Sequence, residues 1–223
     1  MNSFTNELKI KVCGMRDPEN ISGVVAASPD YLGFIFYPKS KRFVGFEPSM
    51  AGLNLVPDSV KKVGVFVDET PEKVLEIYQS WKLDVVQLHG NETPDYCQQM
   101  KDAGITVFKA FSVNEQFDFD ALTAYSTVCE CFLFDTKGQL PGGTGQKFDW
   151  QILANYRGDI PFFLSGGIGP DDVEAVRNFN PPQLFGIDLN SGFEISPAVK
   201  DVEKIRKFIA EIRKANKELT KID

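Results

Sequence analysis

Two short stretches decide the fold of this chain: Leu164-Ser165-Gly166-Gly167-Ile168 and Gly186-Ile187-Asp188-Leu189-Asn190-Ser191-Gly192. Each one closes a short apolar run with a turn that contains glycine. Because glycine has no Cβ, backbone N–H groups there can approach an anion closely. Turns after the last two strands of a (β/α)8 barrel commonly bind a phosphate, and the stretch after Ser191-Gly192 can supply a helix N-terminus that favours negative charge. Each turn alone is typical of a plain connection, but the pair predicts phosphate binding.

Short apolar runs alternate with helix-like segments along the whole chain. We predict eight strands at residues 9–13, 31–36, 62–67, 85–89, 106–111, 131–136, 161–165 and 184–188. We predict helices at residues 17–27, 48–55, 71–81, 94–103, 119–125, 149–156, 170–179 and 199–216. Strands that alternate with helices imply parallel pairing with right-handed crossovers. Since no composition break separates the eight units, we expect residues 1–223 to form one catalytic α/β domain, a (β/α)8 TIM barrel of eight parallel strands.

The rival fold is a doubly wound open sheet, which would place its phosphate-binding glycines after the first strand. Here the first strand ends in Cys13-Gly14-Met15-Arg16 and has no G-x-G-x-x-G pattern. The glycine turns come last instead, and that order favours the closed barrel.

Composition excludes several classes of protein. The chain has 223 residues, which suits one barrel, and its nineteen Phe suit strands that are buried on both faces. A net charge of −7 argues against non-specific binding to nucleic acid or to anionic membranes. There is no apolar stretch long enough to span a membrane and no signal-peptide pattern. We therefore expect a soluble, cytoplasmic protein.

The four cysteines and the single histidine do not suggest a metal site. No C-x-x-C pair is present, and reduced thiols fit the expected compartment. Cys129 and Cys131 lie two apart on a strand-like run, so we expect them to share a face and pack in the core.

In a barrel, catalytic groups lie at the carboxyl ends of the strands. Lys11 and Cys13 share one face of the first strand, where a lysine beside the thiol would favour the thiolate, a usable base or nucleophile. A buried structural cysteine is the equal alternative. Asp135 ends the sixth strand and can serve as a general acid if burial raises its pKa. The alternative is an aspartate that only caps or turns the chain after the strand.

Other polar groups are expected near the same strand ends. Gln87 and His89 share a face of the fourth strand, and we expect them to support the site or contact the substrate. An ordinary structural histidine is the equal alternative for His89. The basic loop after the second strand carries Arg42, which suits a bidentate carboxylate contact, although a solvated loop is the ordinary interpretation. The glycine-rich loop at residues 142–145 can close over a site or be a plain turn.

At these residues, the chain resembles the phosphoribosylanthranilate isomerases of tryptophan biosynthesis. The matching motifs run in order along the chain: KVCGM (11–15), GFIFYPKS (33–40) with Arg42, VQLHGNE (86–92), FDT (134–136), GGTG (142–145) with FDW (148–150), LSGGI (164–168), and GID (186–188) with SGFE (191–194).

The resemblance implies a (β/α)8 barrel that needs no cofactor and no metal. It implies an Amadori rearrangement of N-(5-phosphoribosyl)anthranilate, a small phosphorylated aminosugar, by a protein that is a monomer or a homodimer. The resemblance implies that Cys13 is the general base and Asp135 the general acid. It implies that Arg42 binds the substrate carboxylate and that the phosphate is bound by Gly166, Gly167, Ser191 and Gly192. We further expect four residues to support the site or contact the substrate: Lys11, Gln87, His89 and Asp188.

Two departures from the family pattern concern binding. Lys41 stands where the family often has Pro and adds positive charge beside Arg42, and Asn190 stands where it often has Ser but can still donate a hydrogen bond. Two other functions compete with the isomerase. An indole-glycerol-phosphate synthase is usually longer at its N-terminus and relies on Lys and Glu, and a non-catalytic binder of phosphorylated metabolites would need neither Cys13 nor Asp135.

Overall fold

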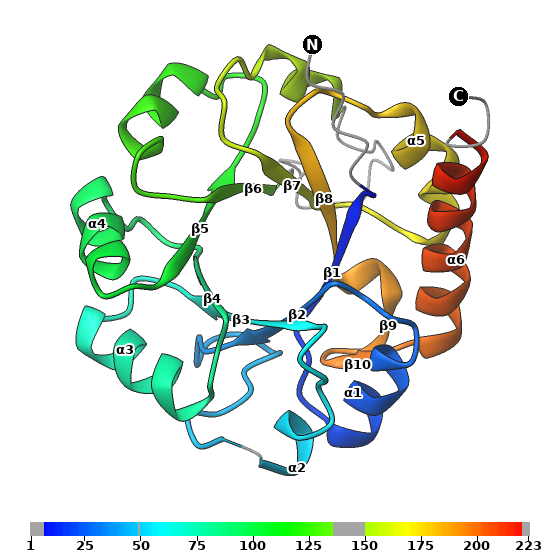
Figure 1. Cartoon of the computed structure of the whole chain (residues 1–223), viewed down its shortest axis with the longest axis horizontal. Coiled ribbons are helices and arrows are strands. Elements are labelled where there is room, and N and C mark those ends of the chain that lie inside the picture. The colour runs from blue at the N-terminus through cyan, green and yellow to red at the C-terminus, as the bar shows by residue number, and fades with distance from the viewer. Residues whose placement is uncertain (1–6, 49, 136–149, 220–223) are drawn as a thin grey trace.

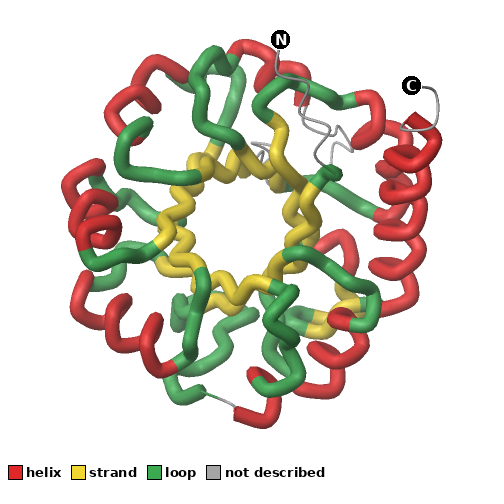
Figure 2. The backbone as a smooth tube through the Cα atoms, in the orientation of Figure 1, coloured by secondary structure: helices red, strands yellow, loops and turns green. Residues whose placement is uncertain are grey.

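The computed structural model describes residues 7–48, 50–135 and 150–219. Eight strands form a closed barrel in the order β1 to β8, and every neighbouring pair is parallel. Figure 2 shows the strands as a ring that the helices surround. The strands are β1 Lys9–Cys13, β2 Tyr31–Ile35, β3 Lys61–Phe66, β4 Val85–Leu88, β5 Thr106–Ser112, β6 Cys131–Asp135, β7 Phe162–Ser165 and β8 Leu184–Leu189. The predicted fold class is confirmed, and among the described residues no strand end differs from its predicted position by more than one residue.

The outer layer consists of α-helices and of short 3-10 helices (Figure 1). The α-helices are α1 Pro18–Val25, α2 Met50–Leu53, α3 Pro71–Ser80, α4 Pro94–Asp102, α5 Val173–Asn178 and α6 Val202–Leu219. The 3-10 helices are η1 Phe119–Tyr125, η2 Trp150–Asn155, η3 Pro170–Asp172 and η4 Ser191–Phe193. Helices α3 and α4 begin as predicted, because Thr70 and Thr93 cap the first turn and a proline follows each of them.

Three predicted helices are wholly or partly 3-10 in form. They are the segments after β5, β6 and β7, where η1, η2 and η3 lie. Short connections are the usual place for this tighter helix. The Asp118 carboxylate accepts the N–H of Asp120 and so caps η1 in its first turn.

The predicted start of the last helix at Val199 is wrong. Residues Glu194–Ser196 (β9) and Val199–Lys200 (β10) instead form an antiparallel pair, which lies beside α1 in Figure 1. Two contacts hold Lys200 extended: its N–H donates to Asn20 Oδ1, and its carbonyl accepts from Asn20 Nδ2. Helix α6 begins after Asp201, whose carboxylate accepts the N–H of Lys204 and caps the first turn.

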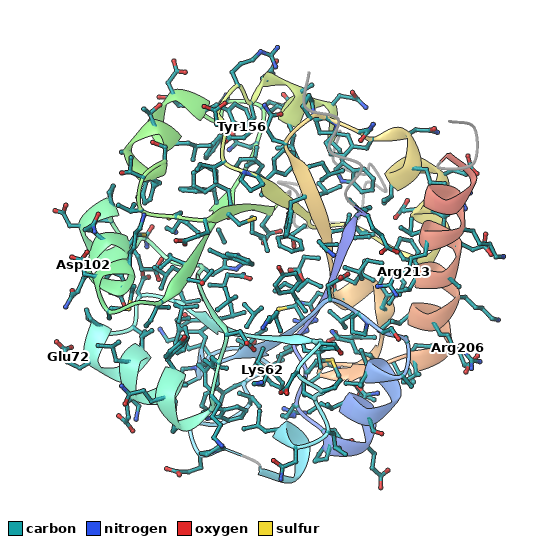
Figure 3. The ribbon with its side chains drawn as sticks, in the orientation of Figure 1. Lys62, Glu72, Asp102, Tyr156, Arg206 and Arg213 are labelled. Atoms are coloured by element: carbon teal, nitrogen blue, oxygen red, sulfur yellow. The ribbon has the colours of Figure 1, made fainter. Side chains whose placement is uncertain are left out.

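The core has two parts, one between the strands and the helices and one inside the barrel. Cys131 and Phe163 belong to the inner part, whereas Cys129 belongs to the outer part. The expectation that Cys129 and Cys131 share a face is therefore wrong, because β6 begins only at Cys131. Figure 3 shows Tyr156, which is buried in the outer part of the core, and Arg206, which points outward from α6.

No helix in the described part of the chain is long and apolar enough to cross a membrane.

Candidate active site

A cavity of about 460 Å³ opens at the carboxyl ends of the strands. The described residues predicted to bind or react lie around it, and Lys11 lies buried beneath it. The cavity is lined by Cys13, Ile35, Tyr37, Ser40, Arg42, Val65, Val67, Gln87, His89, Asp135, Ser165, Gly166, Gly167, Ile168, Asp188, Asn190, Ser191 and Gly192. Residues far apart in the sequence thus converge, as strand ends in a closed barrel must. The predicted loop at residues 142–145 lies outside the described residues.

Cys13 ends β1 and reaches the cavity because the neighbouring strand carries a glycine. A Cβ on Gly33 would lie 2.7 Å from Cys13 Sγ, so any larger residue would displace the thiol. Burial raises the pKa of Cys13, and the charge of Lys11 offsets only part of that rise. Lys11 therefore acts in the predicted direction, but burial outweighs it, and the free protein holds Cys13 as a thiol at neutral pH.

Lys11 and Asp188 form an ion pair under the cavity floor. Lys11 Nζ lies 2.9 Å from Asp188 Oδ1, and both side chains are buried. Although burial lowers the pKa of Lys11, the negative charge of Asp188 opposes that effect, and the pKa lies above its ordinary value. Asp188 Oδ2 also accepts a hydrogen bond from Ser165 at 3.3 Å. The ammonium group is consequently fixed beside the thiol and stays charged.

Asp135 ends β6 and is 5% exposed. Its Oδ2 lies 3.4 Å from His89 Nε2, and His89 Nδ1 lies 3.0 Å from Gln87 Nε2. The structure thus joins three predicted residues in one chain of polar contacts. This chain holds the Asp135 carboxyl group at the cavity wall, within reach of a bound molecule.

Arg42 lines the cavity and is paired with a residue that sequence analysis assigned no role. Its Nε and Nη2 donate to Glu194 at 2.8 and 2.6 Å. Burial alone would raise the pKa of Glu194, but Arg42 and Lys200 lower it to about 2. A guanidinium group has five N–H donors, so the two on Nη1 and one on Nη2 remain for a second carboxylate. Arg42 can hold Glu194 and a ligand at the same time.

The two glycine turns lie side by side, and the first of them has a backbone conformation that favours glycine. Gly166 and Gly167 have φ values of 90° and 70°, a region that side chains disfavour. A Cβ on Gly192 would lie 2.3 Å from the carbonyl oxygen of Ile168, so the two turns touch each other. The predicted helix N-terminus after them is a single 3-10 turn that starts at Ser191.

Sequence analysis missed four buried charged residues that support the site. Glu194 and Lys200 lie on β9 and β10, a hairpin that only tertiary contacts reveal. Lys109 and Glu92 pair at 3.3 Å, and Lys109 Nζ donates to the carbonyl oxygens of the residues on either side of His89. A lysine inside an apolar strand, as in the run at residues 106–112, is the signal that was available.

Three findings define the class of the protein: a closed (β/α)8 barrel, a cavity at its carboxyl face, and titratable side chains around that cavity. This is the architecture of a barrel enzyme that acts on a small molecule. In the described part of the chain, no group of three or more His, Cys, Asp or Glu residues could hold a metal ion.

The chain belongs to the N-(5'-phosphoribosyl)anthranilate isomerase family, whose model matches residues 10–211. It is 48% identical over 204 residues to the isomerase of Parabacteroides distasonis, with 91% of this chain and 92% of that protein covered. The isomerase of Phocaeicola vulgatus is 44% identical over 204 residues, which cover 92% of this chain and 97% of that one.

Solved structures of the same family superpose on the barrel. The isomerase from Thermotoga maritima has a TM-score of 0.82 and 35% identity, covering 93% of this chain and 99% of its own. A phosphoribosylanthranilate isomerase in complex with reduced 1-(o-carboxyphenylamino)-1-deoxyribulose 5-phosphate has a TM-score of 0.79 and 32% identity, with the same coverage.

Proposed function

We propose that this chain converts N-(5-phosphoribosyl)anthranilate into 1-(2-carboxyphenylamino)-1-deoxyribulose 5-phosphate, with Cys13 as general base and Asp135 as general acid. The observation that carries the proposal is the placement of Cys13 and Asp135 on one cavity, from β1 and β6, in a chain that belongs to the isomerase family. The bound molecule in the related solved structure is a reduced form of this product, which supports the choice of substrate.

The first step opens the sugar ring. Asp135, in its neutral form, gives its proton to the ring oxygen while the bond from that oxygen to the anomeric carbon breaks. The nitrogen lone pair forms the C=N bond of a Schiff base, and Asp135 is left as a carboxylate. A carboxylic acid can do this work only in its protonated form.

The second step moves a proton from the adjacent sugar carbon. The thiolate of Cys13 takes this proton, and the C–H electrons neutralise the iminium nitrogen to give an enolamine, which becomes the aminoketone. The positive iminium is the electron sink, so the step as written needs neither metal nor cofactor. Lys11 and the iminium both stabilise the thiolate, and they oppose the burial that raises the pKa of Cys13 in the free protein.

Binding places the substrate across the cavity. We assign its carboxylate to the Arg42 donors that Glu194 leaves available and its phosphate to the turns that contain Gly166, Gly167, Ser191 and Gly192. The position of Gly166 and Gly167 on the cavity wall and their positive φ values support this assignment, because turns of this kind can form anion-binding concavities.

Turnover of the aminosugar by the purified protein tests the proposal. We expect a loss of anthranilate-type fluorescence that depends on the amount of enzyme, with the aminoketone as the product. An indole product would favour the synthase, and binding of the aminosugar without turnover would favour the non-catalytic binder.

The surroundings of the protein form part of the same proposal. We place it in the cytoplasm, where its four buried and unpaired cysteines stay reduced. Residues 1–223 act as one catalytic domain, without nucleic-acid partners, as a monomer or a homodimer. The isomerase from Thermotoga maritima is described as dimeric. Light scattering of the purified protein measures the assembly directly.

A further inference from the structure

Lys200 is a buried cation that the proposed chemistry does not use. Its ammonium group is inaccessible, and its three protons have three acceptors around them. Nζ lies 2.8 Å from Asn190 Oδ1, 2.8 Å from Glu194 Oε1 and 3.4 Å from the Asn190 carbonyl oxygen. Two of the three contacts therefore go to one cavity residue, Asn190.

The contact with Lys200 decides which way the Asn190 amide points. An ammonium group can only donate hydrogen bonds, so the amide must turn its oxygen toward Nζ. Its nitrogen, Nδ2, then points away from Lys200, and it donates to no described residue. Because Asn190 lines the cavity beside Ser191 and Gly192, this nitrogen is available to a ligand there.

The same contact prevents Asn190 from capping its own turn. Asparagine directly before a helical turn normally accepts a backbone N–H of that turn with its side-chain oxygen. Here Asn190 stands before η4 and makes no such hydrogen bond. Its oxygen is held by Lys200 instead, and the N–H groups of Ser191 and Gly192, two residues that line the cavity, donate to no described residue.

We propose that Lys200 is a positioning residue that fixes Asn190 as a hydrogen-bond donor to the substrate phosphate. Lys200 itself does not touch the phosphate, since it is fully buried behind Asn190 and Glu194. The proposal rests on the proposed function, because it assumes that the phosphate lies on the turn that contains Ser191 and Gly192. It also explains how a chain with asparagine at position 190 keeps a donor there.

The test measures the affinity for inorganic phosphate in a double-mutant cycle of Lys200→Met and Asn190→Ala. In the wild-type background, Lys200→Met should weaken phosphate binding about tenfold, the scale of one hydrogen bond to a charged group. In the Asn190→Ala background, the same change should weaken it less than about twofold, because no amide is left to orient. Equal losses in both backgrounds would overturn the proposal.

A matched control separates orientation from net charge. Lys204 lies four residues further along the chain, in α6, and its side chain is 52% exposed. Lys204→Met removes the same charge and should leave the phosphate affinity within about twofold of the wild type, because an exposed charge is screened. A tenfold loss in this control would point to the overall field and would contradict a role through Asn190.

A second variant keeps the proposal testable if Lys200→Met does not fold. Asn190→Asp keeps an oxygen for Lys200 but puts another oxygen where the Nδ2 donor was. We expect it to bind phosphate at least tenfold more weakly than Asn190→Ala, because that oxygen repels the anion. Equal affinities of the two variants would overturn the inference.

Wild-type protein that binds no phosphate would instead remove the proposed phosphate site, and with it the basis of this inference. If the wild-type protein binds phosphate but the effects of Lys200→Met and Asn190→Ala simply add, the phosphate site stands and only the role of Lys200 is disproved.

Discussion

The two ends of the barrel interior are built from the same eight strands but contain opposite kinds of side chain. The carboxyl end holds buried ionisable groups, among them Cys13, Asp135 and the Lys11–Asp188 pair. The amino end is filled by rings: Tyr31 packs edge-on against Phe163 at 5.4 Å, and Phe163 against Phe185 at 5.3 Å. The comparison teaches that the polar end depends on the apolar one, because the rings close the barrel beneath the site.

This closure has an electrostatic consequence for the catalytic end. Because Lys11 and Asp188 are buried at the cavity floor, their charges interact more strongly than they would in solvent. The pairing of Lys11 with Asp188 and the raised pKa of Cys13 both follow from that burial. We therefore expect substitutions at the carboxyl end to change activity and substitutions at the amino end to change stability.

The largest expected effect is that of Cys13→Ser on turnover. A hydroxyl is a far weaker acid than a thiol, so the usable base is lost, and kcat should fall by about 10²–10⁴-fold. Steady-state kinetics measures this loss. Cys131→Ser is the matched control, because Cys131 is also buried inside the barrel but lies at its amino end. The control should lower the unfolding free energy and keep kcat, whereas near-normal activity of Cys13→Ser would disprove its role.

Phe163→Ala should lower stability and leave turnover nearly unchanged, the opposite of what we expect for Cys13→Ser. Phe163 is fully buried among the rings of the amino end. Its truncation should lower the unfolding free energy by about 3–5 kcal/mol. Chemical denaturation measures this change, and the variant that stays folded should keep kcat within about threefold. A large loss of kcat at full folding would show that the two ends are not separable.

Asp135→Asn should lower kcat by about 10²-fold or more and leave the fold intact. The amide keeps the size of the side chain and can still contact His89, so a packing role would survive the change. It cannot deliver a proton, and ring opening would stall. Steady-state kinetics measures the loss of kcat, and a thermal unfolding curve shows whether the fold is intact. An unchanged kcat would show that Asp135 is not the general acid.

Arg42→Ala should act mainly on binding. The loss of a charge-assisted carboxylate contact of roughly 1.5–3 kcal/mol should raise KM, with a smaller change in kcat. Lys41→Ala removes an exposed neighbouring charge and should leave KM nearly unchanged. If Arg42→Ala left both kinetic constants at their wild-type values, the basic loop would be only a solvated surface.

The smallest expected effect is the pH dependence that comes from Glu194. Its pKa is about 2 in the folded protein, below the ordinary 4.5, because Arg42 and Lys200 outweigh its burial. A carboxylate with a depressed pKa stabilises the fold above about pH 4.5, and the effect is lost as the pH falls toward 2. Over that range, wild-type stability should fall more steeply than that of Glu194→Gln. Parallel unfolding curves would contradict this.

The sequence was sufficient for the parts of the site that short-range patterns encode. Strand alternation placed Lys11 and Cys13 on one inward face, and glycine placed the two turns after β7 and β8. It was not sufficient for the β9–β10 hairpin, because the extended form of Lys200 depends on Asn20, which is 180 residues away in the chain. The pairing of Glu194 with Arg42 depends in the same way on tertiary contact.

The sequence predicted that Lys11 would lower the pKa of Cys13, but it did not predict that burial would raise this pKa by more. A lysine beside Cys13 was expected to favour the thiolate, and it does oppose the rise in pKa. The outcome depends on how completely the barrel buries the thiol, which sequence spacing does not give. The separation of Cys129 from Cys131 was missed for a related reason, since it depends on where β6 begins.

The central claim is that Asp135 opens the ring and Cys13 then removes the proton from the adjacent carbon. The most direct test compares the turnover rates of substrate that carries hydrogen or deuterium at that carbon. Our account predicts a primary isotope effect in Cys13→Ser, where proton removal limits the rate, and none in Asp135→Asn, where ring opening limits it. An isotope effect in Asp135→Asn and none in Cys13→Ser would show that the two roles are reversed.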